Sequence, residues 1–203
     1  MFFTFEGIDG VGKSTQLGLF VEWLRSNGHD VVQCRDPGST PLGESLREIL
    51  LHSDDDRPIG PRSEMLLYMA ARAQLVDEVI RPALANGSAV VSDRFLLSNL
   101  VYQAHAGGLD RESVFGVGEI ATDGVLPDLV FLLDASPAEA ERRRGREPDR
   151  MERRGAEYQE KLRQGFLDEA ARDPKRILVI DATQDVDAIH QKIREAAERF
   201  VGD

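Results

Sequence analysis

Apolar residues along the chain follow two patterns, short continuous runs and longer segments with helical spacing. The short runs predict five β-strands, at residues 2–6, 30–35, 89–92, 128–134 and 176–180. Between them, apolar residues recur every three or four positions, as they do between Leu17 and Leu24, and this spacing is typical of an amphipathic helix. The predicted helices span residues 13–26, 42–51, 63–84, 96–105, 111–121, 138–144, 157–171 and 186–201.

This alternation of strands and helices predicts an α/β protein with three layers. Strands separated by helices usually pair in parallel, with helices on both faces of the sheet. The strands here are continuous apolar runs, as expected when both faces are covered. The chain has 203 residues, and we see no linker or internal repeat, so we expect one domain over residues 1–203.

Composition and charge narrow the class of protein. A hydrophobic fraction of 41% excludes intrinsic disorder as a description of the whole chain. The net charge of −11 argues against a nucleic-acid partner, which requires a basic face. The charge is uneven, however: residues 142–154 hold seven arginines and three acidic residues, a net charge of +4, against −15 for the remaining chain. This local positive segment requires an explanation.

Cysteine usage and the amino terminus indicate the compartment. The single cysteine, Cys34, excludes an intramolecular disulfide and a cysteine-based zinc site. The amino terminus lacks a basic leader, and the longest apolar runs are far too short to span a bilayer. We therefore expect a cytoplasmic protein with no membrane partner.

A phosphate-binding loop is predicted between the first strand and the first helix. Residues 7–14 match G-x-x-x-x-G-K-[ST] and comprise Gly7, Ile8, Asp9, Gly10, Val11, Gly12, Lys13 and Ser14. Glycines let successive backbone N–H groups face one anion, and the helix N-terminus adds partial positive charge. Lys13 is expected to reach the β- and γ-phosphates, and Ser14 to offer its hydroxyl to Mg²⁺. The alternative is a chance match in a glycine-containing turn; the flanking strand and helix favour a P-loop NTPase fold.

An acid and a base end the third predicted strand. In a sheet of this kind, ligands bind outside the carboxyl ends of the strands. Asp93 is therefore placed to hold Mg²⁺, directly or through water, and Arg94 to bind a phosphate. The alternative is a structural ion pair. With no Asn-Lys-x-Asp segment for guanine recognition, the size of the chain favours a small-molecule or nucleoside monophosphate kinase.

The chain resembles the bacterial thymidylate kinases, a family of P-loop nucleoside monophosphate kinases, from residue 2 to about residue 201. The resemblance rests on an ordered set of segments: FEGIDGVGKST, RDPGST, YMAAR, DRF, SNLVYQ, PD, LD and the arginine segment ending in DRME. It implies that residues 7–15, including Thr15, bind ATP. It also implies a dTMP site formed by Asp9, Asp36, Pro37, Tyr68, Arg72, Arg94, Ser98, Asn99, Tyr102 and Gln103.

The resemblance further implies individual roles in the dTMP site. Arg72 would reach an exocyclic oxygen of thymine, and Tyr68, one turn earlier on the same helix face, would supply an aromatic face. Tyr102 would lie near the sugar, and Asp9 would face the 3′-hydroxyl or the acceptor side of the metal. The alternatives are a core position for Tyr68, a surface cation at Arg72 and a solvated loop acid at Asp9.

The arginine segment would act as a lid over residues 142–155. The phosphate-binding loop contains no basic residue before Lys13, so by resemblance the lid would supply the catalytic cation. The candidates are Arg142, Arg143, Arg146 and Arg150. The alternative is that these are solvated helix cations balanced by Glu139, Glu141 and Glu147.

Taken together, these features predict Mg²⁺-dependent transfer of the γ-phosphoryl group of ATP to dTMP, giving dTDP and ADP, by a homodimer. Lys13, Arg94, Asp9 and the lid arginines would be catalytic. The alternatives are a kinase for another pyrimidine monophosphate, such as dUMP or UMP, and a nucleotide-binding module without turnover. Three departures from the family pattern affect details: Asp36 in place of glutamate, Phe95 in place of tyrosine or histidine, and Phe166 where tyrosine is frequent.

Overall fold

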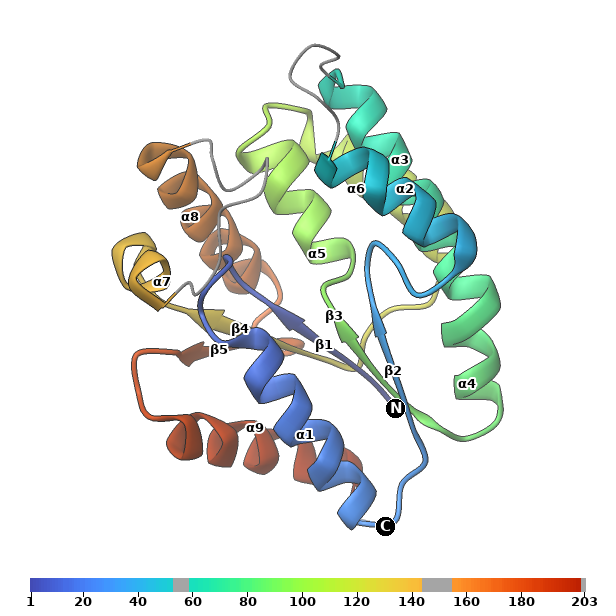
Figure 1. Cartoon of the computed structure of the whole chain (residues 1–203), viewed down its shortest axis with the longest axis vertical. Helices are drawn as coiled ribbons and strands as arrows, with labels where there is room; N and C mark the ends of the chain where they lie inside the picture. Colours follow the sequence, from blue (N-terminus) through green and yellow to red (C-terminus); the bar gives the residue numbers. More distant parts are fainter. Residues whose placement is uncertain (53–58, 144–154, 202–203) are drawn as a thin grey trace.

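The computed structural model describes residues 1–52, 59–143 and 155–201, and these residues form a three-layer α/β fold (Figure 1). The strands are β1 (Phe2–Glu6), β2 (Val31–Arg35), β3 (Ala89–Asp93), β4 (Leu129–Asp134) and β5 (Ile177–Asp181). They pair in parallel in the order β2-β3-β1-β4-β5. The predicted five-stranded parallel sheet is confirmed, with strand ends that differ from the prediction by one residue at most.

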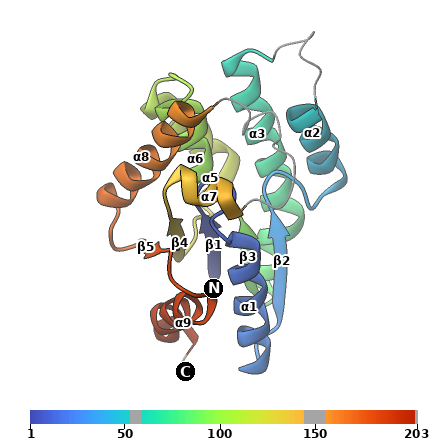
Figure 2. The ribbon, with the colours of Figure 1, turned by 60° about the vertical axis from the view of Figure 1, so that its left-hand side comes forward.

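Helices cover both faces of the sheet. They are α1 (Lys13–Ser26), α2 (Pro41–His52), α3 (Pro61–Leu75), α4 (Arg81–Ala85), α5 (Leu96–Asn99), α6 (Arg111–Thr122), α7 (Pro137–Arg143), α8 (Ala156–Arg172) and α9 (Val186–Val201). Two π-helical segments, η1 (Val76–Ile80) and η2 (Leu100–His105), continue α3 and α5. Figures 1 and 2 show α1 and α9 on one face, and the α3–α4 segment, α5 and α8 on the other.

The helix predicted over residues 63–84 contains a wider turn than expected. The backbone N–H of Arg81 donates to the carbonyl of Val76, five residues earlier, and α4 begins at this point. Pro82 has no N–H to donate to the helix, and a π-turn just before it accommodates this break. The predicted 96–105 helix likewise changes to π geometry at Leu100, in a segment that faces the site described below.

Two apolar clusters hold the layers together. One joins α1 and α9 to the sheet around Phe3, Phe5 and Phe131, and it continues to Phe166 of α8. The other packs Met65, Met69 and other residues of the α3–α4 segment against β3. Both clusters lie between the sheet and its helices, so the polar carboxyl ends of the strands remain at one edge. The described residues contain no helix with the length and apolar character needed to cross a bilayer.

Candidate active site

The loop between β1 and α1 curls tightly against the carboxyl end of the sheet. Gly7 and Gly10 have φ angles of 130° and 92°, in a region that side chains rarely adopt. A Cβ atom on Gly7 would lie 2.4 Å from the Leu133 carbonyl oxygen, and one on Gly10 would lie 2.2 Å from that of Ala140. The glycines therefore permit both the curl and the close approach of the loop to β4 and α7.

Lys13 folds back over this loop from the first turn of α1. Its Nζ donates to the carbonyl oxygens of Gly7 at 3.1 Å and Ile8 at 2.9 Å, and lies 3.2 Å from Oδ1 of Asp9. The side chain is 7% exposed, and burial lowers the pKa of Lys13. The lysine therefore lies at the mouth of the loop, where the motif predicts it.

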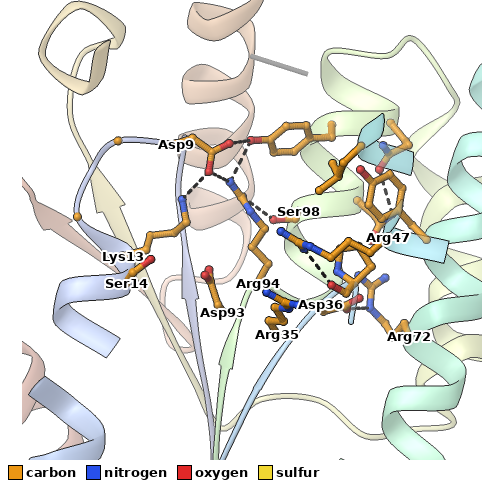
Figure 3. Close-up of a pocket in the computed structure, with 18 of the residues that line it drawn as sticks. Asp9, Lys13, Ser14, Arg35, Asp36, Arg47, Arg72, Asp93, Arg94 and Ser98 are labelled. Atoms are coloured by element: carbon orange, nitrogen blue, oxygen red, sulfur yellow. Dashed lines mark hydrogen bonds and ion pairs between the residues drawn. The ribbon is translucent and has the colours of Figure 1, made fainter. Parts of the chain in front are cut away.

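Asp9 joins Lys13 to Arg94, as Figure 3 shows. Nη2 of Arg94 donates to Oδ1 of Asp9 at 2.6 Å. Burial acts to raise the pKa of Asp9, but Arg94 and Lys13 outweigh it and hold that pKa well below its usual range. Asp9 is therefore a carboxylate shared by two cations, and its reading as a solvated loop acid is wrong.

Arg94 lies at the end of β3 with a φ of 68°, a left-handed conformation uncommon for arginine. Its Nη1 donates to the carbonyl of Gly7 at 3.1 Å and to Oγ of Ser98 at 3.0 Å, and its guanidinium lies 5.2 Å from the ring centroid of Tyr102. These contacts hold the guanidinium between the phosphate-binding loop and the α5–η2 segment.

Arg72 and Asp36 form a buried ion pair at the other end of the site. Nε of Arg72 donates to Oδ2 of Asp36 at 2.6 Å, and the two side chains are 2% and 0% exposed. The guanidinium also lies 5.1 Å from the ring centroid of Phe95. Arg72 is therefore not a surface cation, and that alternative is wrong.

Polar side chains of α5, η2 and α3 complete this end of the site. Nδ2 of Asn99 donates to Oε1 of Gln103 at 2.9 Å, and Nε2 of Gln103 donates to Oε1 of Glu64 at 3.1 Å. Phe166, at a position where tyrosine is frequent in the family pattern, packs edge-on against Tyr102 with 6.3 Å between ring centroids. These contacts fix the η2 side chains along the wall of a cavity.

One cavity of about 650 Å³ connects the two ends. It brings together many predicted site residues: Asp9, Gly10, Gly12, Lys13, Ser14, Thr15, Asp36, Pro37, Tyr68, Arg72, Asp93, Arg94, Ser98, Asn99, Tyr102, Gln103 and Arg143. Gly7, Ile8 and Val11 are buried in the loop and do not line it. A volume of this size suits small-molecule ligands.

The predicted lid arginines differ in position. Arg142 is exposed and pairs with Glu139 at 2.7 Å. Arg143 also pairs with Glu139, but its Nη1 donates to the carbonyl of Ala182 at 2.6 Å, and it lines the cavity. The two arginines lower the pKa of Glu139 to about 2. Arg146 and Arg150 lie outside the described residues.

Ser14 and Asp93 have the chemistry for a magnesium ion. Both line the cavity beside Lys13, as Figure 3 shows. Oδ1 of Asp93 is buried without a hydrogen-bond partner among the described residues, and such an atom requires a ligand, an ion or water. Carboxylate and hydroxyl oxygens are suitable magnesium ligands, so these residues fit the predicted metal.

Sequence reasoning missed several residues of the site. Arg35 and Arg47 line the cavity, and Nη1 of Arg47 donates to the carbonyl of Pro37 at 3.0 Å. Arg35 ends a predicted strand, so the rule that ligands bind at the carboxyl ends of strands could have found it. Arg47 lies on α2 and has no such signal. Glu6, buried at the end of β1, was also missed.

A parallel sheet with a phosphate-binding loop after β1, and a second cationic pocket across the same cavity, defines a P-loop kinase. The family model described as "Thymidylate kinase" matches residues 5–193. This chain therefore belongs to the thymidylate kinase family, and the resemblance seen in the sequence is confirmed.

Individual relatives agree with this assignment. A thymidylate kinase of Caldanaerobacter subterraneus subsp. tengcongensis is 46% identical over 201 residues, covering 98% of this chain and 96% of its own. One of Kosmotoga olearia is 46% identical over 195 residues, covering 95% and 93%. The crystal structure of the thymidylate kinase from Ehrlichia chaffeensis is 31% identical, covers 98% of each chain and has a TM-score of 0.76.

Proposed function

We propose that this chain transfers the γ-phosphoryl group of ATP to dTMP, giving ADP and dTDP. Membership of the thymidylate kinase family makes it a phosphotransferase and supplies both substrates. The observation that carries the proposal is that one cavity holds both a phosphate-binding loop and, facing it, a pocket with buried Arg72 and half-buried Arg94. A binding module without turnover would not need this second pocket.

On the donor side, we assign ATP to the loop of residues 7–15 and to Lys13. The loop's backbone N–H groups and the N-terminus of α1 are suited to the phosphates. Lys13 adds a positive charge at the loop mouth, close to where the γ-phosphate would bind. Arg143 approaches from α7 and lines the same cavity, which supports a donor-side role for it.

On the acceptor side, we assign the phosphate of dTMP to Arg94 and its base to Arg72. Arg94 lies next to the donor loop, so an acceptor phosphate bound there would be near the γ-phosphate. Arg72 lies deeper, with Tyr68, Asn99 and Gln103 around the same cavity, and suits a flat base with exocyclic oxygens.

Arg35 and Arg47 extend this cationic lining, and we propose that they contribute to phosphate binding. Asp36 belongs to the proposed base pocket because it forms an ion pair with Arg72. Pro37, Ser98 and Tyr102 form the wall that would contact the phosphate and the sugar.

In the reaction, an oxygen of the dTMP phosphate forms a bond to the γ-phosphorus as the bond to the β–γ bridging oxygen breaks. The attacking phosphate is already an anion, so the site requires no strong general base. Lys13 and Arg94 instead orient the two phosphates and stabilise the charge that spreads over the transferred group. Arg143, Arg142, Arg146 and Arg150 remain the proposed lid cations.

We propose that Ser14 and Asp93 hold Mg²⁺. Oδ1 of Asp93, buried without a partner among the described residues, supports this assignment. When bound, the ion neutralises charge on the phosphate oxygens. The residues bring the hydroxyl and carboxylate to the donor side of the cavity, beside Lys13.

We also propose that the protein is a homodimer and that it is located in the cytoplasm. Each chain would form one domain. Large aliphatic side chains are exposed on α2, α3 and α6: Leu42, Ile49, Leu66 and Ile120. The three helices are neighbours, α3 packing against both α2 and α6, and these exposed side chains support a dimer contact there. Sedimentation of the wild type beside Leu66→Asp tests the dimer, and a monomeric wild type would contradict it.

A substrate panel tests the proposed function. Steady-state rates with ATP and dTMP, dUMP, UMP, CMP or AMP should be highest with dTMP. A preference for dUMP or UMP would favour a kinase for another pyrimidine monophosphate. ADP release that does not rise when any acceptor is added would favour a binding module.

A further inference from the structure

Glu6, the last residue of β1, is a buried carboxylate below the acceptor pocket. It is fully buried and is not among the residues that line the cavity. Oε1 accepts from the backbone N–H of Phe95 at 2.8 Å, and Oε2 accepts from the hydroxyl of Ser98 at 2.6 Å. Through these bonds the carboxylate holds the segment that links β3 to α5.

The first consequence concerns Arg94. The bond to the Phe95 N–H fixes the peptide directly after the left-handed backbone of Arg94. The hydroxyl of Ser98 donates to Glu6, so its oxygen is turned to accept from Nη1 of Arg94 at 3.0 Å. Glu6 therefore helps to orient both the backbone and the guanidinium of Arg94.

The second consequence concerns Arg72. The backbone bond from Phe95 to Glu6 sets the position of the Phe95 ring, which packs edge-on against Phe2 with 5.0 Å between centroids. The Arg72 guanidinium contacts the same ring, 5.1 Å from its centroid. One carboxylate thus supports both arginines that we assign to dTMP.

Charge gives an independent reason to examine Glu6. Burial raises the pKa of Glu6 to about 7, while Arg94, Ser98, the Phe95 N–H and Arg72 act in the opposite direction. A neutral glutamine would fill the same volume at a lower desolvation cost. Only a carboxylate, however, offers an acceptor oxygen to the Phe95 N–H and a second one to the Ser98 hydroxyl.

We propose that Glu6 is a positioning residue for the acceptor: its carboxylate, acting through Ser98 and Phe95, holds Arg94 and Arg72 in the geometry that binds dTMP. This inference rests on the proposed roles of those two arginines. Glu6 itself does not touch substrate.

Glu6→Gln is the direct test. The amide oxygen can still accept from the Phe95 N–H, but the amide nitrogen can only donate, so the bond with Ser98 is reversed. We expect the KM for dTMP to rise about tenfold, the cost of one charge-assisted hydrogen bond, while the KM for ATP changes less than twofold. Calorimetric titration with dTMP should show the same loss of affinity.

Glu169→Gln is the matched control. Glu169 is also a buried glutamate, and it accepts from Arg111 and pairs with His105 at 2.8 Å, away from the cavity lining. It should leave the ratio of the two KM values unchanged. An equal rise of both KM values in Glu6→Gln, or no rise for dTMP, would overturn the inference.

Two further variants keep the outcomes separable. Arg94→Ala tests the proposed role of Arg94. If Arg94→Ala leaves dTMP binding intact, the site assignment fails. If Arg94→Ala weakens dTMP binding but Glu6→Gln does not, only the inference about Glu6 fails. Ser98→Ala removes the intermediate hydroxyl, and its effect should not add to that of Glu6→Gln. If Glu6→Gln does not fold, Glu6→Asp takes its place, because it keeps the charge but shortens the side chain that reaches Ser98 and Phe95; a dTMP-specific rise in KM supports the inference, and an unchanged KM overturns it.

Discussion

The two ends of the cavity are built in different ways. The donor end is a continuous loop of residues 7–15, and the proposed binding groups there are the backbone and one lysine. The acceptor end is assembled from side chains of β2, α2, α3, α5 and η2 and from Arg94 after β3, so its residues range from Arg35 to Gln103 in the sequence. A backbone site depends on glycines and one helix end, whereas a side-chain site depends on residues behind it that hold each group in place.

This difference predicts that one substitution disables the donor end. Lys13→Ala should reduce kcat/KM by about 10³-fold or more, because no other lysine lies at the loop. Lys161→Ala, which removes an exposed lysine paired with Glu157 on α8, is the control and should retain activity. A variant of Lys13 with near wild-type turnover would show that the loop is not the donor site.

For the acceptor end, we expect a supporting residue, Glu6, to make the free energy of unfolding depend on pH. The folded state raises the pKa of Glu6 from 4.5 to about 7, so between these values it retains a proton that the unfolded chain releases. The free energy of unfolding therefore falls as pH rises through this window, by about 3 kcal/mol in total, and Glu6→Gln lacks this loss.

Chemical denaturation at pH 5 and pH 8 measures this effect as the difference between wild type and Glu6→Gln. Glu169→Gln is again the control. Burial acts to raise the pKa of Glu169, but Arg111 and His105 lower it overall, so its contribution to stability is lost only at acid pH below this window. A difference for Glu6→Gln that does not change with pH would mean that Glu6 does not titrate between pH 5 and 8.

The acceptor end should also separate the two substrates kinetically. Arg72→Ala should raise the KM for dTMP about 10- to 100-fold, because a buried charge-assisted contact is lost, and should change the KM for ATP little. Arg81→Ala, at an exposed arginine that pairs with Asp123, is the control. Equal changes in both KM values would remove Arg72 from the base pocket.

The smallest effects on activity are expected for Arg142 and Arg143, the two proposed lid arginines that the structure describes. Arg143→Ala should raise the KM for ATP a few-fold, because Arg143 lines the cavity, whereas Arg142→Ala should change it less than twofold. The ion pair of Arg142 with Glu139 is exposed, and such pairs contribute about 0.2–1 kcal/mol. Equal effects from both variants would contradict a specific donor-side role for Arg143.

The sequence predicts the donor end well because its geometry is local. The spacing of glycines around Lys13 determines how the loop folds, and the flanking strand and helix can be recognised from apolar spacing alone. The sheet follows for the same reason: each strand is a short apolar run between helices. The positions of Asp93 and Arg94 follow from one further rule, that strand ends face the ligand.

The remaining features depend on contacts between distant segments. Arg47 reaches the cavity because α2 packs against α3, and nothing in its neighbouring residues indicates this. Glu64 is buried through its contact with Gln103, 39 positions away. The π-turn at η1 precedes Pro82, a local signal that a pattern read at 3.6 residues per turn does not use, whereas the residues of η2 carry no such signal.

The carboxylate of Asp9, placed between Lys13 and Arg94, gives the site an internal counter-ion. With phosphates bound to Lys13 and Arg94 as proposed, substrate binding would be an exchange of anions rather than the filling of a bare positive pocket, since each phosphate would take over a cation that Asp9 already neutralises. An ordinary anion has to displace a tethered carboxylate at very short range. A nucleotide would have the additional contacts of its base and sugar to offset that displacement, so the shared carboxylate would disfavour simple phosphate.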